Sequence, residues 1–343
     1  MCDIAHLQFW FETLLGCIFG YSPFERLITQ ASFFDWLLAL PTASLLGSSF
    51  FIKVERYILL HYPKEAATRA LYDGKDTPRK VAKLMASCMK VNTVKYGILL
   101  IQIVEEVRQK ERAFSIIKKC ASVAPRLEED DDKNKLLEVW KFLTDRPYPP
   151  SFSHSSSFPD PMKQETSWAD IGFQNPLRDF RGVGQLGLKN LLYFAKIHRL
   201  RAREVLEESL QPAMWFPFAA TGLNITMWLL EFLRAGQLSC FFYRNSMKPL
   251  EIFNAIYCFS FLEFSRFWKI SRPADILQFG KISLQFKKRL QIILRDLSKE
   301  APQGEWNLAA DTGEQLIEEL RWWIDGEIHP HRNRRRLYTV MNV

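Results

Sequence analysis

The amino-acid sequence predicts an all-α protein, a multi-helix bundle preceded by a helical N-terminal region. Apolar side chains recur at intervals of three and four residues over several long segments, which places them on one face of a helix. Strand-like alternation is scarce, and no Asn-Gly or Asp-Gly pair joins two apolar runs as in a hairpin; Asp73–Gly74, for example, precedes charged residues. These observations favour helices throughout.

Two apolar stripes predict helices in the first part of the chain. The first stripe follows Val94, Ile98 and Ile101 and continues to Val107, and the second lies within residues 136–143. We expect each stripe to be the buried face of its helix.

The helical pattern strengthens in the second part of the chain. Five segments carry apolar residues at helical spacing: 188–195, 221–232, 250–268, 276–293 and 316–324. Pro273 stands where the first turn of a helix accepts proline, just before the fourth of these segments. We expect these helices to pack into one bundle.

A stretch rich in proline and serine, residues 147–165, interrupts the helical pattern. It contains no usable helical or strand period, so we interpret it as a linker. The predicted organisation is an apolar, helical N-terminal region over 1–146, the linker over 147–165, the helical bundle over 166–300, and a C-terminal helix with a basic tail over 301–343.

Charge and cysteine usage limit the classes of partner. The 343 residues carry a formal net charge of +8, which favours an acidic partner such as an anionic lipid or an acidic protein face. Zinc-finger spacing and RNA-binding or basic-region motifs are missing from the sequence, so we expect no nucleic-acid partner. The cysteines lie in apolar or helical stretches without paired spacing, which is typical of reduced thiols in the cytoplasm. They are Cys2, Cys17, Cys88, Cys120, Cys240 and Cys258.

The apolar N-terminus and the basic C-terminus suggest peripheral contact with an internal membrane. Asp3 and Glu12 make the first residues a poor signal peptide, and the uncharged stretch 36–52 is too polar and too short for a membrane span. We therefore expect an interfacial or core helix there, and a peripheral membrane contact through residues 1–60 and the Arg332–Arg336 tail.

One segment, Trp168–Phe194, differs from the rest because it combines turn residues with charged and aromatic ones. Gly172, Gly182 and Gly184 permit close backbone approach or positive φ angles, and Trp168 and Phe173 are candidate apolar anchors. The segment predicts a turn-rich loop that leads into a helix.

This loop presents Arg178, Asp179 and Arg181 on a backbone held by its anchors, which is a suitable arrangement for a charged site. Two interpretations of Arg181 remain: a structural ion pair, for example with Asp179, or a functional guanidinium. Gln174 either orients a water or phosphate, or caps a turn. The glycine spacing is not that of a P-loop, and the scattered histidines predict no metal site.

The order Trp168, Gly172–Phe173–Gln174, Asp179–Phe180–Arg181–Gly182, Gly184 and the following leucines resembles the signature of the ELMO domain-containing family. Further likeness follows at 222–226, 253–257 and 264–268, so the resemblance covers about residues 168–297. The sequence departs from the family's pattern in a shortened connection between Gln174 and Asp179 and in Val183, where methionine is usual.

The resemblance implies a helical ELMO domain and a GTPase-activating protein for Arf-family (Arf/Arl) small GTPases. It implies that the GTP-bound GTPase is the partner, that Arg181 is the catalytic arginine, with Arg178 as the alternative, and that the chain needs no cofactor or metal. In that role the chain regulates GTP hydrolysis and has no independent active site. The alternative function is that of a non-catalytic adaptor or scaffold, which binds small GTPases or their exchange factors at membranes.

Overall fold

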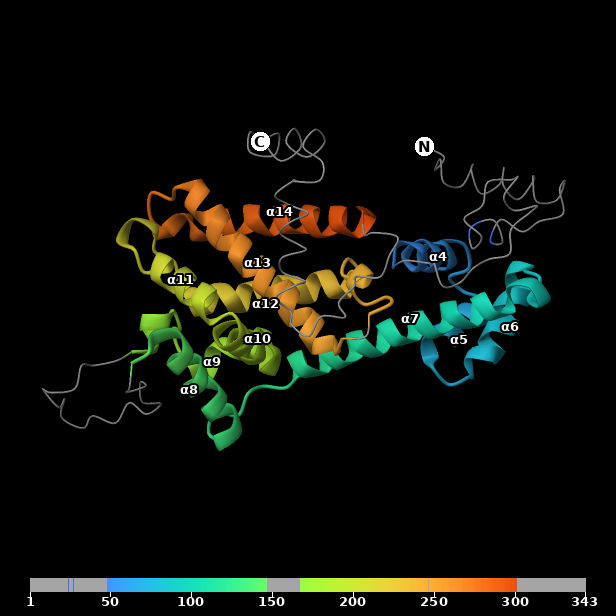
Figure 1. The fold of residues 1–343 in the computed structure, drawn as a ribbon, viewed down its shortest axis with the longest axis horizontal. Helices are drawn as coiled ribbons and strands as arrows, with labels where there is room; N and C mark the ends of the chain where they lie inside the picture. The colour runs from blue at the N-terminus through green and yellow to red at the C-terminus, as the bar shows by residue number, and fades with distance from the viewer. Residues whose placement is uncertain (1–23, 25–26, 28–47, 147–166, 246, 301–343) are drawn as a thin grey trace, which may run out of the picture. The chain divides into compact units, whose positions relative to one another are not determined.

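The computed structural model describes Phe24, Leu27 and residues 48–146, 167–245 and 247–300 (Figure 1). Over these residues the chain forms helices and no strand. The predicted all-α fold is therefore confirmed for the described part of the chain. Several predicted features lie outside it: the linker at 147–165, the helix at 316–324, the basic tail, Cys2, Cys17 and nearly all of residues 1–47.

The described residues divide into two compact units. The first comprises Phe24, Leu27, 48–113 and 239–245, and the second comprises 114–146, 167–238 and 247–297. The second unit thus begins well before residue 166, where the sequence pattern placed the start of the bundle. The reason is that residues 130–144 pack against a helix that follows the proline- and serine-rich stretch, a contact that local sequence patterns do not report.

The core of the first unit contains apolar side chains of four helices together with Phe24 and Tyr243, and Tyr243 follows a 3-10 turn. These elements are α4 (Ser48–His61), α5 (Ala66–Asp73), α6 (Pro78–Met89), the first part of α7 (Thr93–Ser122) and η5 (Ser239–Phe241). Helix α6 begins where the sequence favours it: the Thr77 side chain accepts a hydrogen bond from the Lys80 amide, and Pro78 occupies the first helical position.

A buried carboxylate organises this core. Glu55 of α4 accepts hydrogen bonds from Tyr72 (2.7 Å), Lys110 (2.6 Å) and Tyr243 (2.6 Å). Burial, followed by the nearby Glu55 charge, raises the pKa of both tyrosines, so both hydroxyls stay protonated and donate. Because Tyr243 comes from the connection between α12 and α13, that connection belongs to the core of the first unit.

The buried face of α7 differs from the predicted stripe. Val94 is 97% and Ile98 is 75% exposed, whereas Tyr96, Leu99 and Ile103 are buried. The prediction for Val94 and Ile98 was wrong because this helix carries apolar residues on more than one side, and packing alone decides which side is covered. Val104 and Val107, at the end of the same stripe, are buried as expected.

Helix α10 (Gly184–Ile197) contacts most of the second unit (Figure 1). Its neighbours are α8 (Asp130–Thr144), α11 (Arg199–Ser209), α12 (Phe218–Arg234) and α13 (Pro249–Ser271). The last helix, α14 (Phe279–Glu300), packs through Phe286 on Trp228 and Phe264, with ring centroids 6.2 and 5.2 Å apart. The first turn of α8 is acidic, with Asp130, Asp131 and Asp132, as the dipole of a helix favours at its N-terminus.

Close helix packing and aromatic rings build the core of this unit. Phe194 of α10 lies 5.3 Å from the Phe261 ring and stacks on Phe218 at 6.3 Å. A Cβ at Gly222 would lie 2.4 Å from the Tyr257 hydroxyl, so only glycine permits this approach of α12 to α13. Residues 212–234 are long and apolar enough to span a membrane. However, 72% of their most apolar 18-residue window is buried, which identifies α12 as a core helix.

Candidate functional site

The candidate site is the loop 167–184, which leads into α10 as a series of short helical turns. These turns are η2 (Trp168–Ile171), α9 (Pro176–Asp179) and η3 (Phe180–Gly182). At the start of the loop, Ser167 and Asp170 form a capping box, and Asp170 also pairs with Arg146 at 2.7 Å. The loop is therefore tied at its entrance to the end of α8.

A row of buried aromatic rings holds the loop against α8. Trp168 packs edge-on against Trp140 of α8 (5.7 Å) and against Phe173 (6.1 Å), and Phe173 in turn lies 5.7 Å from Phe180. All four rings are buried. The structure thus confirms Trp168 and Phe173 as anchors, and it adds Trp140, which the sequence pattern assigned only to a helical stripe.

Asp179 closes the shortened connection as a compact turn. Its Oδ2 atom accepts hydrogen bonds from the backbone amides of Gln174 and Asn175, both at 2.9 Å. Asn175 caps α9 by accepting from the Leu177 amide, and Pro176 occupies the first helical position. The turn is therefore complete with the residues present, because each places a cap or an acceptor where the backbone needs it.

This geometry bears on the structural interpretation of Arg181, in which Asp179 is its ion-pair partner. Its carboxylate is occupied by backbone amides, and the structure shows no ion pair between Asp179 and Arg181. Gln174 contributes its backbone amide to the turn, while its side chain is exposed. The capping of this turn comes from Asn175 and Asp179, and Gln174 does not provide it.

Two of the three predicted glycines are required by the fold. At Gly172 (φ +84°) a Cβ would lie 2.3 Å from the Phe218 amide nitrogen, and at Gly184 (φ +55°) 2.3 Å from the Ala121 carbonyl oxygen. Both positions therefore combine a left-handed backbone with contact to another segment's backbone. Gly182 is different: its φ is not positive, a Cβ would have open space, and the residue is exposed.

The two arginines of the loop point to solvent. Arg178 and Arg181 are both exposed, and within the described part of the chain neither guanidinium group forms a hydrogen bond or an ion pair. Arg181 is flanked by the buried side chains of Phe180 (3% exposed) and Val183 (2%). Its backbone is thus fixed on both sides, whereas Arg178 follows the exposed Leu177.

Further hydrogen bonds join α8 and the segment after α7 to the first turn of α10, where the loop ends. Asp132 accepts hydrogen bonds from the Arg126 amide (2.9 Å), Lys135 (3.0 Å) and the Gln185 side chain (3.3 Å). The Gln185 amide donates to the Val123 carbonyl at 2.7 Å. These contacts were not predicted, because no sequence motif relates residues 123–132 to residue 185.

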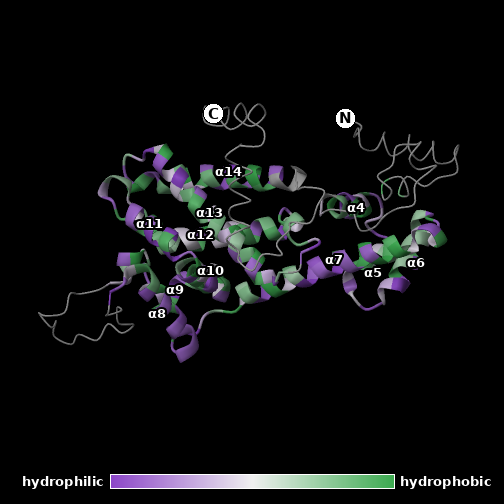
Figure 2. Cartoon of the chain, in the orientation of Figure 1, coloured by the Kyte–Doolittle hydropathy of each residue, from purple (hydrophilic) through white to green (hydrophobic). Residues whose placement is uncertain are grey.

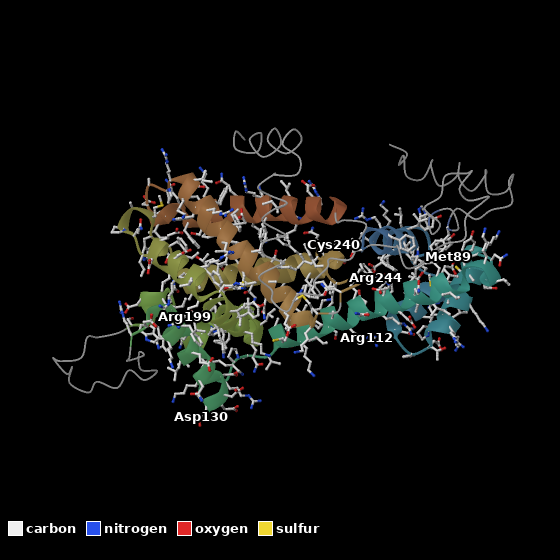
Figure 3. All side chains as sticks on the ribbon, viewed as in Figure 1. Met89, Arg112, Asp130, Arg199, Cys240 and Arg244 are labelled. Atoms are coloured by element: carbon white, nitrogen blue, oxygen red, sulfur yellow. The ribbon has the colours of Figure 1, made fainter. Side chains whose placement is uncertain are left out.

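The electrostatics of Asp132 fit this supporting position. Burial alone raises the pKa of its carboxyl, but the hydrogen bonds from Arg126, Lys135 and Gln185 outweigh burial, and the pKa lies below its ordinary value. Asp132 is therefore charged at neutral pH and holds the first turn of α8 against α10. Figure 3 labels the neighbouring Asp130, at the start of the same helix.

Thiol and metal chemistry receive no support from the described residues. Cys88, Cys120, Cys240 and Cys258 are free, and burial raises the pKa of each thiol. Within the described ranges, no three side chains of His, Cys, Asp or Glu gather in a way that would hold a metal ion. The exposed charged side chains of the loop are those of Arg178 and Arg181.

Comparison with known proteins places this loop in a family. Residues 116–283 match the ELMO/CED-12 family. Over 125 residues the chain is 38% identical to ELMO domain-containing protein B of Dictyostelium discoideum, which covers 36% of this chain and 43% of that protein. It is 33% identical over 184 residues to human ELMO domain-containing protein 1 (45% and 52%) and 35% identical over 133 residues to mouse ELMO domain-containing protein 2 (38% and 45%).

The matched region explains the boundary of the second unit. The match begins at residue 116, close to Phe114, where that unit starts, and it includes α8 with Trp140 and Asp132. The chain spans about half the length of the curated relatives it matches. Residues 116–283, which carry the loop 167–184 and the helices that support it, are therefore a region of the ELMO/CED-12 type.

Proposed function

We propose that the second unit activates GTP hydrolysis by an Arf-family small GTPase, with Arg181 inserted into the nucleotide site of the bound partner. The observation that supports this most is the exposed guanidinium of Arg181 on a backbone fixed by Phe180 and Val183. The resemblance of the Asp179–Gly182 motif to GTPase-activating members of the family supports the same role.

The chemistry of GTP hydrolysis explains why such an arginine accelerates it. As the γ-phosphate is transferred to water, negative charge spreads over the phosphate oxygens, and a guanidinium supplied by a second protein stabilises that charge. Such an arginine raises the rate on the order of 10³–10⁵-fold. The GTPase supplies the nucleotide, the Mg²⁺ and the group that orients the water, so this chain contributes only the positioned charge.

The rigidity of the loop matters for this role. Misplacement of a catalytic group by about 1 Å costs roughly 10²-fold in rate. Asp179 and the aromatic rings hold the loop in place in the free protein. Binding the partner therefore does not require the loop to lose conformational entropy.

Of the two exposed arginines, Arg181 is the better candidate. Phe180, which precedes it, and Val183, two residues after it, are buried, and these two side chains restrict the position of its Cα. Arg178 lies in the single turn of α9 beside the exposed Leu177. We therefore assign the catalytic role to Arg181 and a binding role at the rim of the contact to Arg178.

The test is single-turnover GTP hydrolysis by purified, GTP-loaded Arf-family GTPases in the presence of the chain. We expect wild type to accelerate hydrolysis by at least one of them, Arg181→Ala to lose 10²-fold or more of that acceleration, and Arg178→Ala to lose only a few-fold. Arg178→Ala is the matched control, because it removes the same charged group from the same loop. A chain that binds the GTPase without accelerating hydrolysis contradicts the proposal and favours the adaptor function.

A further inference from the structure

The outward face of α14 carries cations and leucines in a regular arrangement. Lys281, Leu284 and Lys288 succeed one another at intervals of three and four residues and are all exposed. Leu277, in the 3-10 turn η6 (Ile276–Gln278) that leads into the helix, is 86% exposed, and Leu284 is 55% exposed. Figure 2 shows this alternation of hydrophilic and hydrophobic residues along α14.

The opposite face of α14 is committed to the core, so the outward face cannot turn inward. Phe286 packs against rings of α12 and α13, and Leu290 and Leu294 are fully buried. Lys287 is occupied by Glu231 of α12 in an ion pair. The helix is therefore held in one rotation, which fixes Lys281, Leu284 and Lys288 on the outside.

The charge of this face is one-sided. From residue 279 to residue 296, α14 contains five cations, two of them Lys281 and Lys288, and a single carboxylate, Asp296, which pairs with Arg295. Solvated helix faces ordinarily mix the two signs at intervals of four residues, because such pairs stabilise a helix. Lys281 and Lys288 form no ion pair with any described residue, and their charge is available to an anionic surface.

We propose that this face, defined by Leu277, Lys281, Leu284 and Lys288, docks on an anionic lipid membrane. Lysines next to leucines on the outside of a helix are typical of helices that lie in a membrane interface, where the leucines enter the acyl boundary and the lysines contact headgroups. Leu277 and Leu284 place apolar area beside these cations, and a membrane interface takes up the leucines and the lysines in one contact.

This inference is independent of the proposed GTPase activation and of the expected contacts through the chain's two ends. It uses only described residues of α14 and η6; Leu277 and Lys281 lie within the region matched by the family, and Leu284 and Lys288 follow it. If both proposals hold, the membrane contact and Arg181 belong to the same compact unit, so one unit would carry both the lipid contact and the catalytic group.

The test is sedimentation of the full chain with vesicles of phosphatidylcholine alone or of phosphatidylcholine mixed with phosphatidylserine. We expect binding to the anionic vesicles, and we expect Lys281→Glu/Lys288→Glu to lower it about tenfold or more, since a cation near such a surface contributes about 1 kcal/mol. Leu277→Gln/Leu284→Gln should lower it several-fold without changing the net charge.

The matched control is Lys83→Glu/Lys141→Glu, two exposed lysines on α6 and α8. Both double variants reduce the formal net charge from +8 to +4, because each change removes two positive units. The control should bind as wild type does. Circular dichroism and the unfolding midpoint establish that all variants are folded.

Three outcomes overturn the proposal. The first is that wild type does not bind anionic vesicles. The second is that Lys281→Glu/Lys288→Glu and the control lose binding equally, which assigns the binding to overall charge or to other parts of the chain. The third is loss in the Lys281/Lys288 variant with wild-type binding by the Leu277/Leu284 variant, which reduces the contact to electrostatic attraction and removes the role of the leucines in docking.

Discussion

Two glycines of one motif, Gly182 and Gly184, should respond very differently to the same substitution. Alanine at Gly184 must adopt a φ of +55°, which costs roughly 1–2 kcal/mol for a residue with a Cβ. Its Cβ would also lie 2.3 Å from the Ala121 carbonyl oxygen and 2.5 Å from that of Val123, so two segments must separate. We expect Gly184→Ala to lower the free energy of unfolding by about 3 kcal/mol or more.

Alanine at Gly182 meets neither obstacle. The backbone there has a negative φ, and nothing lies within 4 Å of the added Cβ. Alanine also has the higher helical propensity in this 3-10 turn. The free energy of unfolding of Gly182→Ala should therefore lie within about 1 kcal/mol of the wild-type value.

Urea unfolding followed by tryptophan fluorescence measures the difference, because Trp140 and Trp168 lie beneath this loop. With an m-value of about 1–3 kcal/mol per M, Gly184→Ala should move the midpoint down by roughly 1 M or more, while Gly182→Ala leaves it nearly unchanged. Equal midpoints for Gly184→Ala and wild type, or an equal loss in both variants, would refute the reasoning.

Three further predictions concern the loop and its support. Gly182→Leu should reduce GTPase activation at least tenfold and should unfold like wild type. The reason is that Gly182 is exposed and has no side chain, so it leaves room for a partner beside Arg181. Normal activation by this variant in the same assay would show that no partner approaches there. Asp179→Ala leaves the Gln174 and Asn175 amides without their acceptor and should cost about 1–2 kcal/mol, with faster hydrogen exchange at both amides; unchanged exchange would mean that another group closes the turn. Asp132→Asn should cost about 1–2 kcal/mol at neutral pH, and because the folded-state pKa of Asp132 lies below its unfolded value, this difference should persist above about pH 4 and vanish as the pH falls through the folded pKa; a pH-independent difference in urea midpoints would contradict it.

The long, regular helices of the second unit could be predicted from the sequence because only one face of each helix carries the repeated apolar residues. In α12 and α13 the predicted faces, from Thr221 to Phe232 and from Leu250 to Trp268, are buried, apart from Leu250, which is half-buried. In α7 apolar residues occur on two faces, and the structure buries the face with Leu99 and Ile103 while Ile98 stays exposed. Local spacing does not contain the information that selects between them, since only the packed neighbours provide it.

The candidate site likewise contains residues that could be predicted from the sequence and residues that could not. Its glycines and its aromatic anchors follow from residue types whose backbone or packing demands are strong, as Gly172 and Trp168 show. Its supporting residues do not, because Trp140 and Asp132 come from α8, on the far side of residues 147–165 in the sequence. The occupation of the Asp179 carboxylate by backbone amides was equally hidden, since sequence alone does not distinguish an amide acceptor from an ion-pair partner.

The central claim is that Arg181 supplies a charge used in the transition state of GTP hydrolysis. The most direct measurement is the single-turnover rate constant at saturating concentrations of wild type, Arg181→Ala and Arg181→Lys with a GTP-loaded Arf-family GTPase. The account predicts that both variants lose 10²-fold or more of the maximal rate constant while the half-saturating concentration changes only a few-fold, because an ammonium does not reproduce the planar fork of a guanidinium. A maximal rate constant for Arg181→Ala equal to that of wild type would contradict it.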